Sequence, residues 1–220
     1  MIRDFIPFSS YLKYFFKRLT LKIKRPDVGL GENVSFAGVV FGKNVHVGDN
    51  SILINCVIGD YTYFSINNVI KRVVIGNFCS IGPNVIIAPG FHPTKTFVST
   101  SPVFYNPNNM LNVAITKAKT FEDELNVKVG NDVWIGANVI LADGVTIGDG
   151  VIIAANSFVK DNVPDYAIVA GCPAKILKYR FTEDLINKLK VSRWWDRDIN
   201  YLKQHVDLFQ NVDLFDQHFK

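Results

Sequence analysis

One histidine of this chain stands where it could carry out proton transfer. The chain contains His46, His92, His205 and His218. His46 lies between two valines of a regular segment and should point outward, while His205 and His218 belong to an amphipathic C-terminal stretch and should be solvated. His92 opens a long irregular stretch, and long loops within compact repeats usually carry function. Because imidazole can take a proton from a hydroxyl or an amine near neutral pH, we expect His92 to act as a general base.

The other nucleophilic side chains show no comparable arrangement. Cys56, Cys79 and Cys172 are odd in number, scattered and without a CxxC pair, which is typical of a reducing compartment and leaves a catalytic thiol as a minor alternative. No serine–histidine–acid order and no cysteine–histidine pair is visible, so a covalent acyl-enzyme is not required. If the electrophile is a thioester, direct transfer within a ternary complex is the economical mechanism, and backbone N–H groups of exposed turns can stabilise the tetrahedral oxyanion.

The irregular stretch that carries His92 runs from about residue 89 to residue 126. It contains several prolines and two short apolar patches, but no usable repeat. Three acidic residues near its end are candidates to orient the imidazole: Glu122, Asp123 and Glu124.

The segments that must position this loop form a repeat of six residues. From Val127 to Val163 the chain reads VKVGND, VWIGAN, VILADG, VTIGDG, VIIAAN and SFVKDN, and the same phase runs from Val73 to Ala88. Neither the period of two of a hairpin array nor the 3.6 of a helix explains sixes. A parallel β-helix does, because short strands between tight turns place one branched apolar residue per hexad in a shared interior. We therefore predict an all-β solenoid whose valines, isoleucines and glycines are scaffold.

The N-terminal segment, residues 1–26, is aromatic and basic. Its apolar residues fall at helical spacing: Phe8, Tyr11, Leu12, Phe15, Phe16 and Leu19. Pro7 and the charges exclude a bilayer-spanning helix, and no cleavable signal is recognised. Two roles stay open: a cap on the exposed end of the solenoid, which we favour, or a helix that lies on a membrane surface.

The remaining chain divides into a β-helix over residues 27–181 and a helical segment over residues 182–220. Thr182 is expected to cap the first helix of that segment. Trp194 and Trp195 are expected to anchor the helices on the coils or on a neighbouring subunit. With a net charge of +4 and no dense basic stripe interleaved with aromatics, the 220-residue chain is not expected to bind nucleic acid.

The hexads, the looped-out histidine within IGPNVIIAPGFHPT, and the stretches VWIGANVIL, VKDNVPDYAIVAGCPAKI and RWWDRDI resemble the hexapeptide-repeat acyltransferases. The resemblance covers roughly residues 28–205. The WWD motif is similar to one in xenobiotic acetyltransferases of the streptogramin and chloramphenicol type. The PG…HP motif is similar to one in sugar O-acetyltransferases. The resemblance implies a left-handed parallel β-helix and an acetyl-CoA-dependent acetyltransferase that needs no metal. It further implies a homotrimer with active sites between subunits and His92 as the catalytic base.

The resemblance also implies a binding track for acetyl-CoA. The pantetheine arm would lie near Trp134, Ala137 and Ala155, where small residues permit close approach to the backbone. Lys160 and Lys175 match positions near the adenosine end, where a cation would face phosphates. The alternatives are packing between subunits for Trp134 and solvated surface for the two lysines.

The long loop and the basic helix depart from the antibiotic-acetylating pattern. We therefore expect O-acetylation of a sugar hydroxyl of a bacterial surface polysaccharide or its precursor, in the cytoplasm or at the inner face of the membrane. The alternatives are N-acetylation of a nucleotide-linked amino sugar, or O-acetylation of an antibiotic. A zinc enzyme on the same coil would need several histidines on adjacent coils, and only His46 and His92 lie in the coil region. A purely structural solenoid would have no reason to interrupt its repeat with such a loop.

Overall fold

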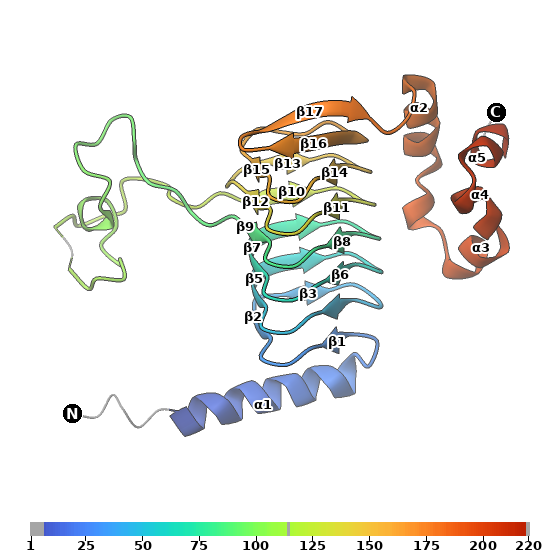
Figure 1. The fold of residues 1–220 in the computed structure, drawn as a ribbon. Helices are drawn as coiled ribbons and strands as arrows, with labels where there is room; N and C mark the ends of the chain where they lie inside the picture. The colour runs from blue at the N-terminus through green and yellow to red at the C-terminus, as the bar shows by residue number, and fades with distance from the viewer. Residues whose placement is uncertain (1–6, 114, 219–220) are drawn as a thin grey trace.

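The protein is a stack of parallel coils with a helix across one end and helices beside the other (Figure 1). The computed structural model describes residues 7–113 and 115–218, with side chains from Leu12 onward except that of Lys13. The first six residues of the expected N-terminal segment, and the side chains of Phe8 and Tyr11, lie outside this description. The predicted left-handed parallel β-helix is confirmed.

The N-terminal half begins with one helix and continues as short strands. Their bounds are α1 (Pro7–Lys24), β1 (Gly29–Leu30), β2 (Ser35–Ala37), β3 (Val40–Phe41), β4 (His46–Val47), β5 (Ile52–Ile58), β6 (Tyr63–Phe64), β7 (Val69–Ile75), β8 (Ser80–Ile81) and β9 (Ile86–Ile87). The loop that follows contains a short 3₁₀ turn, η2 (Pro102–Phe104).

The repeat resumes after the loop. Its strands are β10 (Val127–Val129), β11 (Trp134–Ile135), β12 (Ile140–Leu141), β13 (Thr146–Ile147), β14 (Ile152–Ile153), β15 (Phe158–Val159), β16 (Ala167–Gly171) and β17 (Ala174–Tyr179). The C-terminal helices are α2 (Glu183–Ser192), η3 (Trp194–Asp196), α3 (Ile199–Gln204), α4 (Val206–Gln210) and α5 (Val212–His218). The second C-terminal segment, expected as one amphipathic stretch, is therefore broken into short helices.

Each coil hydrogen-bonds to the coil below and the coil above it. One face stacks the strands in the order β1-β4-β6-β8-β11-β14-β16, and all these pairs are parallel. Partners in successive coils are 17 residues apart before the loop, 18 apart directly after it and 16 apart at the last coil. This difference explains why the hexad register slips upstream of the loop. The antiparallel hairpin β16–β17 closes the far end of the stack.

The interior contains the apolar residues that the hexads predicted. Phe64, Ile81, Ile135 and Ile153 are fully buried, as are the first-position residues Val85, Val133, Val139 and Val151. Cys79 occupies one of these first positions and is also fully buried. The branched side chains thus form a continuous core along the axis, and at about 25 cal/mol per Å² their burial supplies the main driving force for folding.

The coil turns three corners, and each corner is a column of residues with left-handed backbone. The asparagine corner is formed by Asn33, Asn50, Asn67, Asn84, Asn138 and Asn156. The loop corner is formed by Gly38, Asn55, Arg72 and Ala88, and the aromatic corner by Asn44, Tyr61, Phe78, Asp132, Gly150 and Tyr166. Asparagine tolerates this conformation better than most residues. Its side chains also form a ladder, in which Asn84 receives a bond from Asn67 at 3.2 Å and donates one to Asn138 at 2.9 Å.

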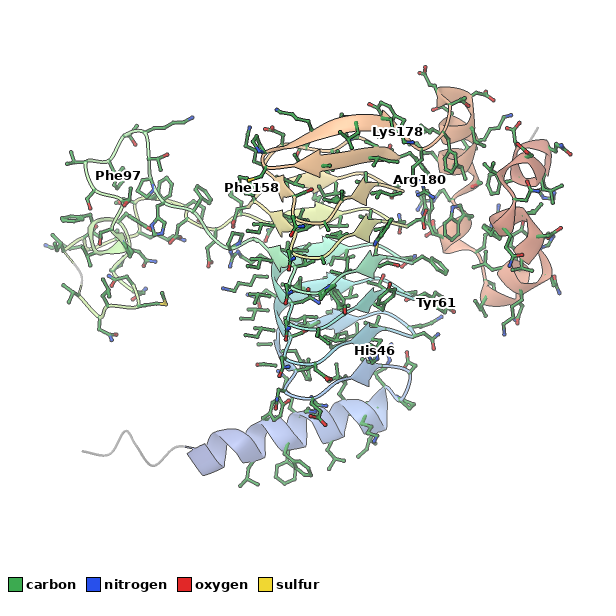
Figure 2. The ribbon with its side chains drawn as sticks, viewed as in Figure 1. His46, Tyr61, Phe97, Phe158, Lys178 and Arg180 are labelled. Atoms are coloured by element: carbon green, nitrogen blue, oxygen red, sulfur yellow. The ribbon has the colours of Figure 1, made fainter. Side chains whose placement is uncertain are left out.

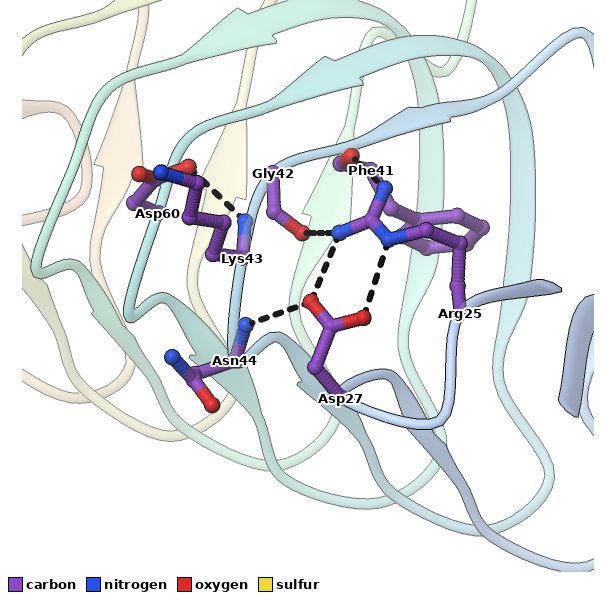
Figure 3. Close-up of a pocket in the computed structure, with 7 residues that line it drawn as sticks. All are labelled: Arg25, Asp27, Phe41, Gly42, Lys43, Asn44 and Asp60. Carbon is purple, nitrogen blue, oxygen red and sulfur yellow. Dashed lines mark hydrogen bonds and ion pairs between the residues drawn. The ribbon is translucent and has the colours of Figure 1, made fainter.

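Helix α1 caps the first coil, as the sequence analysis favoured. Arg18 donates to the carbonyls of Leu30 and Gly31 at 3.1 and 2.9 Å, which satisfies part of the exposed coil edge. Arg25 pairs with Asp27 at 2.7 Å and donates to the carbonyls of Phe41 and Gly42 at the end of the first coil (Figure 3). These contacts line a hollow of about 590 Å³ just beyond the end of α1, at the edge of the first coils. No helix within the described residues is long and apolar enough to cross a bilayer.

The C-terminal helices pack on the aromatic corner. Trp194 lies 5.1 Å from the ring of Phe78, and the carbonyl of the buried Trp195 accepts a hydrogen bond from Asn77. The tryptophans therefore anchor these helices on the coils, as predicted. Thr182 occupies the N-cap of α2, but its side chain makes no capping bond, so that part of the expectation is wrong.

Substitution at the asparagine corner should separate backbone strain from the side-chain ladder. Asn84→Ala loses the ladder bonds and forces a Cβ-bearing residue without a polar side chain into φ +58°. Asn84→Gly loses the same bonds without that strain. We expect Ala to lower the free energy of unfolding by about 1 kcal/mol more than Gly does, as measured by denaturant titration. Equal losses would show that the ladder, and not the backbone, sets the cost.

Candidate active site

An arginine–aspartate pair closes the base of the long loop. The guanidinium of Arg72 donates to the carbonyl of Ala88 at 2.8 Å, at the point where the chain leaves the coil. It also bonds Glu124 at 2.8 Å and Asp143 at 3.2 Å. The Asp143 carboxylate, which is almost fully buried, accepts from the backbone N–H of Gly90 and of Leu125. One buried ion pair thus holds both ends of the loop together, so the residues directly after Ala88 start from a fixed position.

The loop that projects from this base has a small aromatic core of its own (Figure 2). Phe91, Phe97, Tyr105 and Phe121 meet edge to face, with ring centroids 5.4 to 6.2 Å apart. Tyr105 is fully buried, and its carbonyl accepts a bond from Thr120. Edge-to-face aromatic pairs stabilise such a cluster beyond the area that they bury. The loop therefore has a defined shape rather than an arbitrary course.

His92 lies between the base of the loop and this aromatic core. Its Nδ1 is 2.9 Å from the carbonyl oxygen of Thr100 and 3.0 Å from the hydroxyl of Tyr105. A carbonyl can only accept, so we assign the proton to Nδ1, which leaves a lone pair on Nε2. Within the described part of the chain, no residue hydrogen-bonds Nε2, and the side chain is exposed. The ring is thereby held in the tautomer that can accept a proton from an incoming group.

The acidic residues considered as orienting groups do not contact His92. Glu122 and Asp123 both pair with Lys119, at 2.8 and 2.9 Å, and Glu124 pairs with Arg72. The contacts of His92 instead come from Thr100 and Tyr105, which the sequence analysis did not identify. The several aromatic residues of the loop were a sequence signal for Tyr105. No such signal exists for Thr100, because it bonds His92 through its backbone carbonyl, which every residue type has.

Burial keeps the Tyr105 hydroxyl protonated. It raises the pKa of this phenol, and the charge of Asp123 raises it further. At neutral pH the group beside Nδ1 is therefore an uncharged hydroxyl.

Two of the residues predicted to contact the acyl donor share one edge of the solenoid. Ala137 and Ala155 lie in successive coils, each directly before an asparagine of the asparagine corner, and the N–H of Asn156 donates to the carbonyl of Ala137. In the coils below the loop this position holds larger residues: Glu32, Asp49, Ile66 and Pro83. A Cβ added to Gly136 would come within 2.6 Å of the backbone nitrogen of Ala155. Along this edge, side chains are therefore small in the coils that follow the loop and larger in the coils that precede it.

The other three predicted donor contacts lie elsewhere. Trp134 is exposed on the sheet face that precedes the asparagine corner, in register with Ser80 and Ile152. Lys160 follows β15 in the column of the loop corner, where it pairs with Asp161 at 2.9 Å. Lys175, on β17, acts on the same carboxylate, and the two lysines together lower the pKa of Asp161, the hydrogen bond from Lys160 contributing most. The structure thus brings the lysines together, but separates them from Ala137 and Ala155 by one strand.

The cysteines do not form part of a site. Cys56 and Cys79 are buried, and desolvation raises the pKa of Cys56 to about 11 and that of Cys79 to about 12. A thiol with such a pKa is a poor nucleophile at neutral pH. Cys172 is exposed at the tip of the β16–β17 hairpin. Among the described residues, no three histidine, cysteine or acidic side chains are close enough to hold a metal ion.

The family model described as "Bacterial transferase hexapeptide (six repeats)" matches residues 126–161. A chloramphenicol acetyltransferase of Morganella morganii is 30% identical over 142 residues, which are 64% of this chain and 67% of that protein. A lipopolysaccharide biosynthesis O-acetyl transferase of Escherichia coli K12 is 38% identical over 52 residues, 24% of this chain and 26% of that protein. A solved structure of a mutant of AntD, an N-acyltransferase from Bacillus cereus in complex with dTDP and coenzyme A, superposes with a TM-score of 0.58 at 23% identity. It covers 78% of this chain and 95% of that one, and shows the shared fold.

The chain belongs to the hexapeptide-repeat acetyltransferases. The predicted resemblance is thereby confirmed, and the protein is an acetyltransferase of this family.

Thiol titration should reflect the burial of the cysteines. At pH 8 a thiol with a pKa of about 11 is ionised to about one part in a thousand, so Cys56 and Cys79 should react slowly with a disulfide reagent. We expect one fast-reacting thiol per native chain and three after denaturation. In Cys172→Ser the fast phase should disappear. A fast phase that persists in that variant would contradict the burial of the other two thiols.

Proposed function

We propose that the protein transfers an acetyl group from acetyl-CoA to a sugar hydroxyl, with His92 as the general base. The observation that carries the proposal is the position of His92, whose Nδ1 lies 2.9 Å from the carbonyl oxygen of Thr100 and 3.0 Å from the hydroxyl of Tyr105, whereas no described residue bonds Nε2. An exposed, pre-oriented imidazole lone pair is the group that activation of a hydroxyl requires. Acetyl-CoA is a cytoplasmic metabolite, so we place the reaction in the cytoplasm.

The proposed mechanism is direct transfer. Nε2 of His92 takes the proton of the acceptor hydroxyl as its oxygen forms a bond to the thioester carbonyl carbon. The tetrahedral oxyanion is stabilised by backbone N–H groups at a coil turn. The carbon–sulfur bond then breaks, and the imidazolium returns the proton to the departing thiolate. The carbonyl of Thr100 stabilises the charged intermediate state, because it accepts from Nδ1–H throughout.

We assign the donor to the edge of small residues. The pantetheine arm would pass Trp134 on the adjoining sheet face and then Ala137 and Ala155, whose small side chains permit contact with the backbone. Lys160 and Lys175 would face the phosphates, because both already bring positive charge to one carboxylate, Asp161. Exchange of that carboxylate for a phosphate would leave the two cations paired.

We further propose a homotrimer with active sites between subunits. Within one chain the loop that carries His92 leaves from the loop corner and projects away from the coils (Figure 1), whereas Ala137 and Ala155 lie on the asparagine corner. Apolar side chains are exposed on the loop, and a ladder of exposed valines in register runs along the face between the loop and aromatic corners: Val40, Val57 and Val74. Contact between subunits would cover these surfaces and bring a histidine to a neighbour's donor track.

A second acceptor class has a specific observation in its favour. The 30% identity to a chloramphenicol acetyltransferase supports an antibiotic hydroxyl as the acceptor. We favour a sugar of a surface polysaccharide or its precursor, because His92 is exposed on a projecting loop, where a large polar acceptor can reach it. The relative from lipopolysaccharide biosynthesis supports the same choice.

Replacement of His92 tests the proposed function. His92→Ala should lower kcat by about 10²- to 10⁴-fold, measured as transfer of labelled acetyl groups to a panel of sugars, nucleotide-sugars and chloramphenicol. The rise in Tm caused by acetyl-CoA should be retained, as should the sedimentation coefficient of the assembly. His46→Ala is the matched control, since His46 is an exposed coil histidine far from the loop (Figure 2). A His92→Ala enzyme that keeps most of its rate would remove this residue from the mechanism.

Tyr105 should act as a positioning residue. Tyr105→Phe keeps the buried ring but removes the hydroxyl that lies 3.0 Å from Nδ1. We expect kcat to fall by roughly five- to tenfold, with KM for acetyl-CoA and the Tm of the unliganded protein unchanged. Tyr63→Phe, which removes an exposed hydroxyl from a coil face, provides the control. A loss of Tm in parallel with kcat would indicate a merely structural role.

A further inference from the structure

Helix α1 has an exposed apolar face that its role as a cap does not explain. Phe15, Phe16 and Ile23 are 51%, 58% and 72% exposed, and Leu12 and Leu19 are exposed beside them. At 100° per residue these five positions fall within an arc of roughly 100°. Single exposed apolar residues are common on protein surfaces, but a contiguous stripe of two phenylalanines and three aliphatic residues marks an interaction surface.

The opposite face of α1 holds the helix on the coils. Leu21 packs against the core, and Arg18 and Arg25 donate to coil carbonyls. Lys17 lies 4.2 Å from the ring centroid of Phe36. Because these contacts fix the rotation of the helix about its axis, the apolar stripe is directed away from the stack. Figure 2 shows the side chains of this outer side projecting away from the coils.

The charge of α1 defines what can cover the stripe. The helix contains five basic residues and no acidic one: Lys13, Lys17, Arg18, Lys22 and Lys24. Lys22 and Lys24 are exposed, and by helical geometry they flank the stripe on opposite sides. Aromatic and aliphatic side chains between lysines suit a surface that is apolar below a layer of negative charge. A second copy of the helix would instead bring lysine against lysine.

We propose that the outer face of α1 docks this protein on the surface of an anionic lipid membrane. The phenylalanines and Ile23 enter the boundary between headgroups and acyl chains, while Lys22 and Lys24 lie beside lipid phosphates. The helix lies across the end of the stack (Figure 1), so the solenoid axis stands away from the bilayer. β8 lies three coil spacings above β1, and at about 4.8 Å per spacing the coil that bears the loop stands about 15 Å above the first coil. An acceptor held at the membrane surface would thus lie within reach of that side of the molecule.

Vesicle flotation tests this docking without reference to catalysis. The full chain should float with phosphatidylcholine vesicles that contain phosphatidylglycerol and remain unbound with phosphatidylcholine alone. The double variant Phe16→Gln with Ile23→Gln should lower the partition coefficient by about tenfold or more, because two apolar side chains no longer enter the bilayer. Lys22→Gln should lower it by about fivefold and weaken its dependence on salt. Val191→Gln, which changes an exposed valine of α2, is the matched control and should bind like wild type.

Two results would overturn the proposal. One is equal flotation of wild type and of the double variant on anionic vesicles. The other is a larger assembly of wild type in sedimentation velocity that the double variant dissolves, which would assign the stripe to a second copy of the chain. Acetyl transfer to a soluble acceptor should be the same in wild type and in the double variant. Failure of the docking proposal is therefore distinguishable from failure of the proposed function.

Discussion

The hydrogen bonds between successive coils are the constraint on which the rest of the structure depends. The parallel strands bond to the equivalent strands one coil away, and these bonds continue into the turns, for example from Gly82 to Ile135 and from Gly136 to Ile153, each at 2.8 Å. A coil that changed its path would lose these bonds along its whole length, and an unpaired buried backbone group is costly. The three corners therefore recur at the same places along the stack, and most of their positions have left-handed backbone. Functional residues are therefore expected where a loop leaves a corner or where the residue types at a corner change.

The three corners carry three different tasks. The aromatic corner accepts the C-terminal helices through Phe78 and Trp194. The loop corner releases the segment that carries His92, and it can do so because Arg72 and Asp143 replace the lost coil contacts with a buried ion pair. Removal of one partner of such a pair leaves an uncompensated charge, so both residues are needed for the loop to start from a fixed place. The asparagine corner keeps the same backbone path along the stack, but the side chains beside it are small at Ala137 and Ala155.

The fold could be predicted from sequence because its signal is local and repeated. Each hexad identifies its own buried residue, and a period of six predicts that the coils stack on one another. The site could be predicted only in part. His92 is conspicuous as the histidine at the break, but its partner Thr100 bonds through a backbone carbonyl, and the Arg72–Asp143 contact spans 71 residues. The acidic residues of the same loop were poor candidates to orient His92, because in space they pair with Lys119 and Arg72. The change from 17 to 18 residues per coil also hid which positions share a corner.

The separation of tasks among corners has a consequence for assembly. A rigid prism cannot bend its loop corner onto its asparagine corner, because the coil hydrogen bonds fix both. In the proposed mechanism, a histidine at one corner and a donor track at another meet when the loop of one molecule reaches the coils of the next. The projecting loop, with its own aromatic core and exposed outer side chains, has the form that such a reach requires. Helix α1 closes the end of the same prism, so contacts made through the corners leave its outer face uncovered. The geometry of a repeated coil therefore places the proposed catalytic surfaces on the sides of the stack and the proposed docking surface at its end.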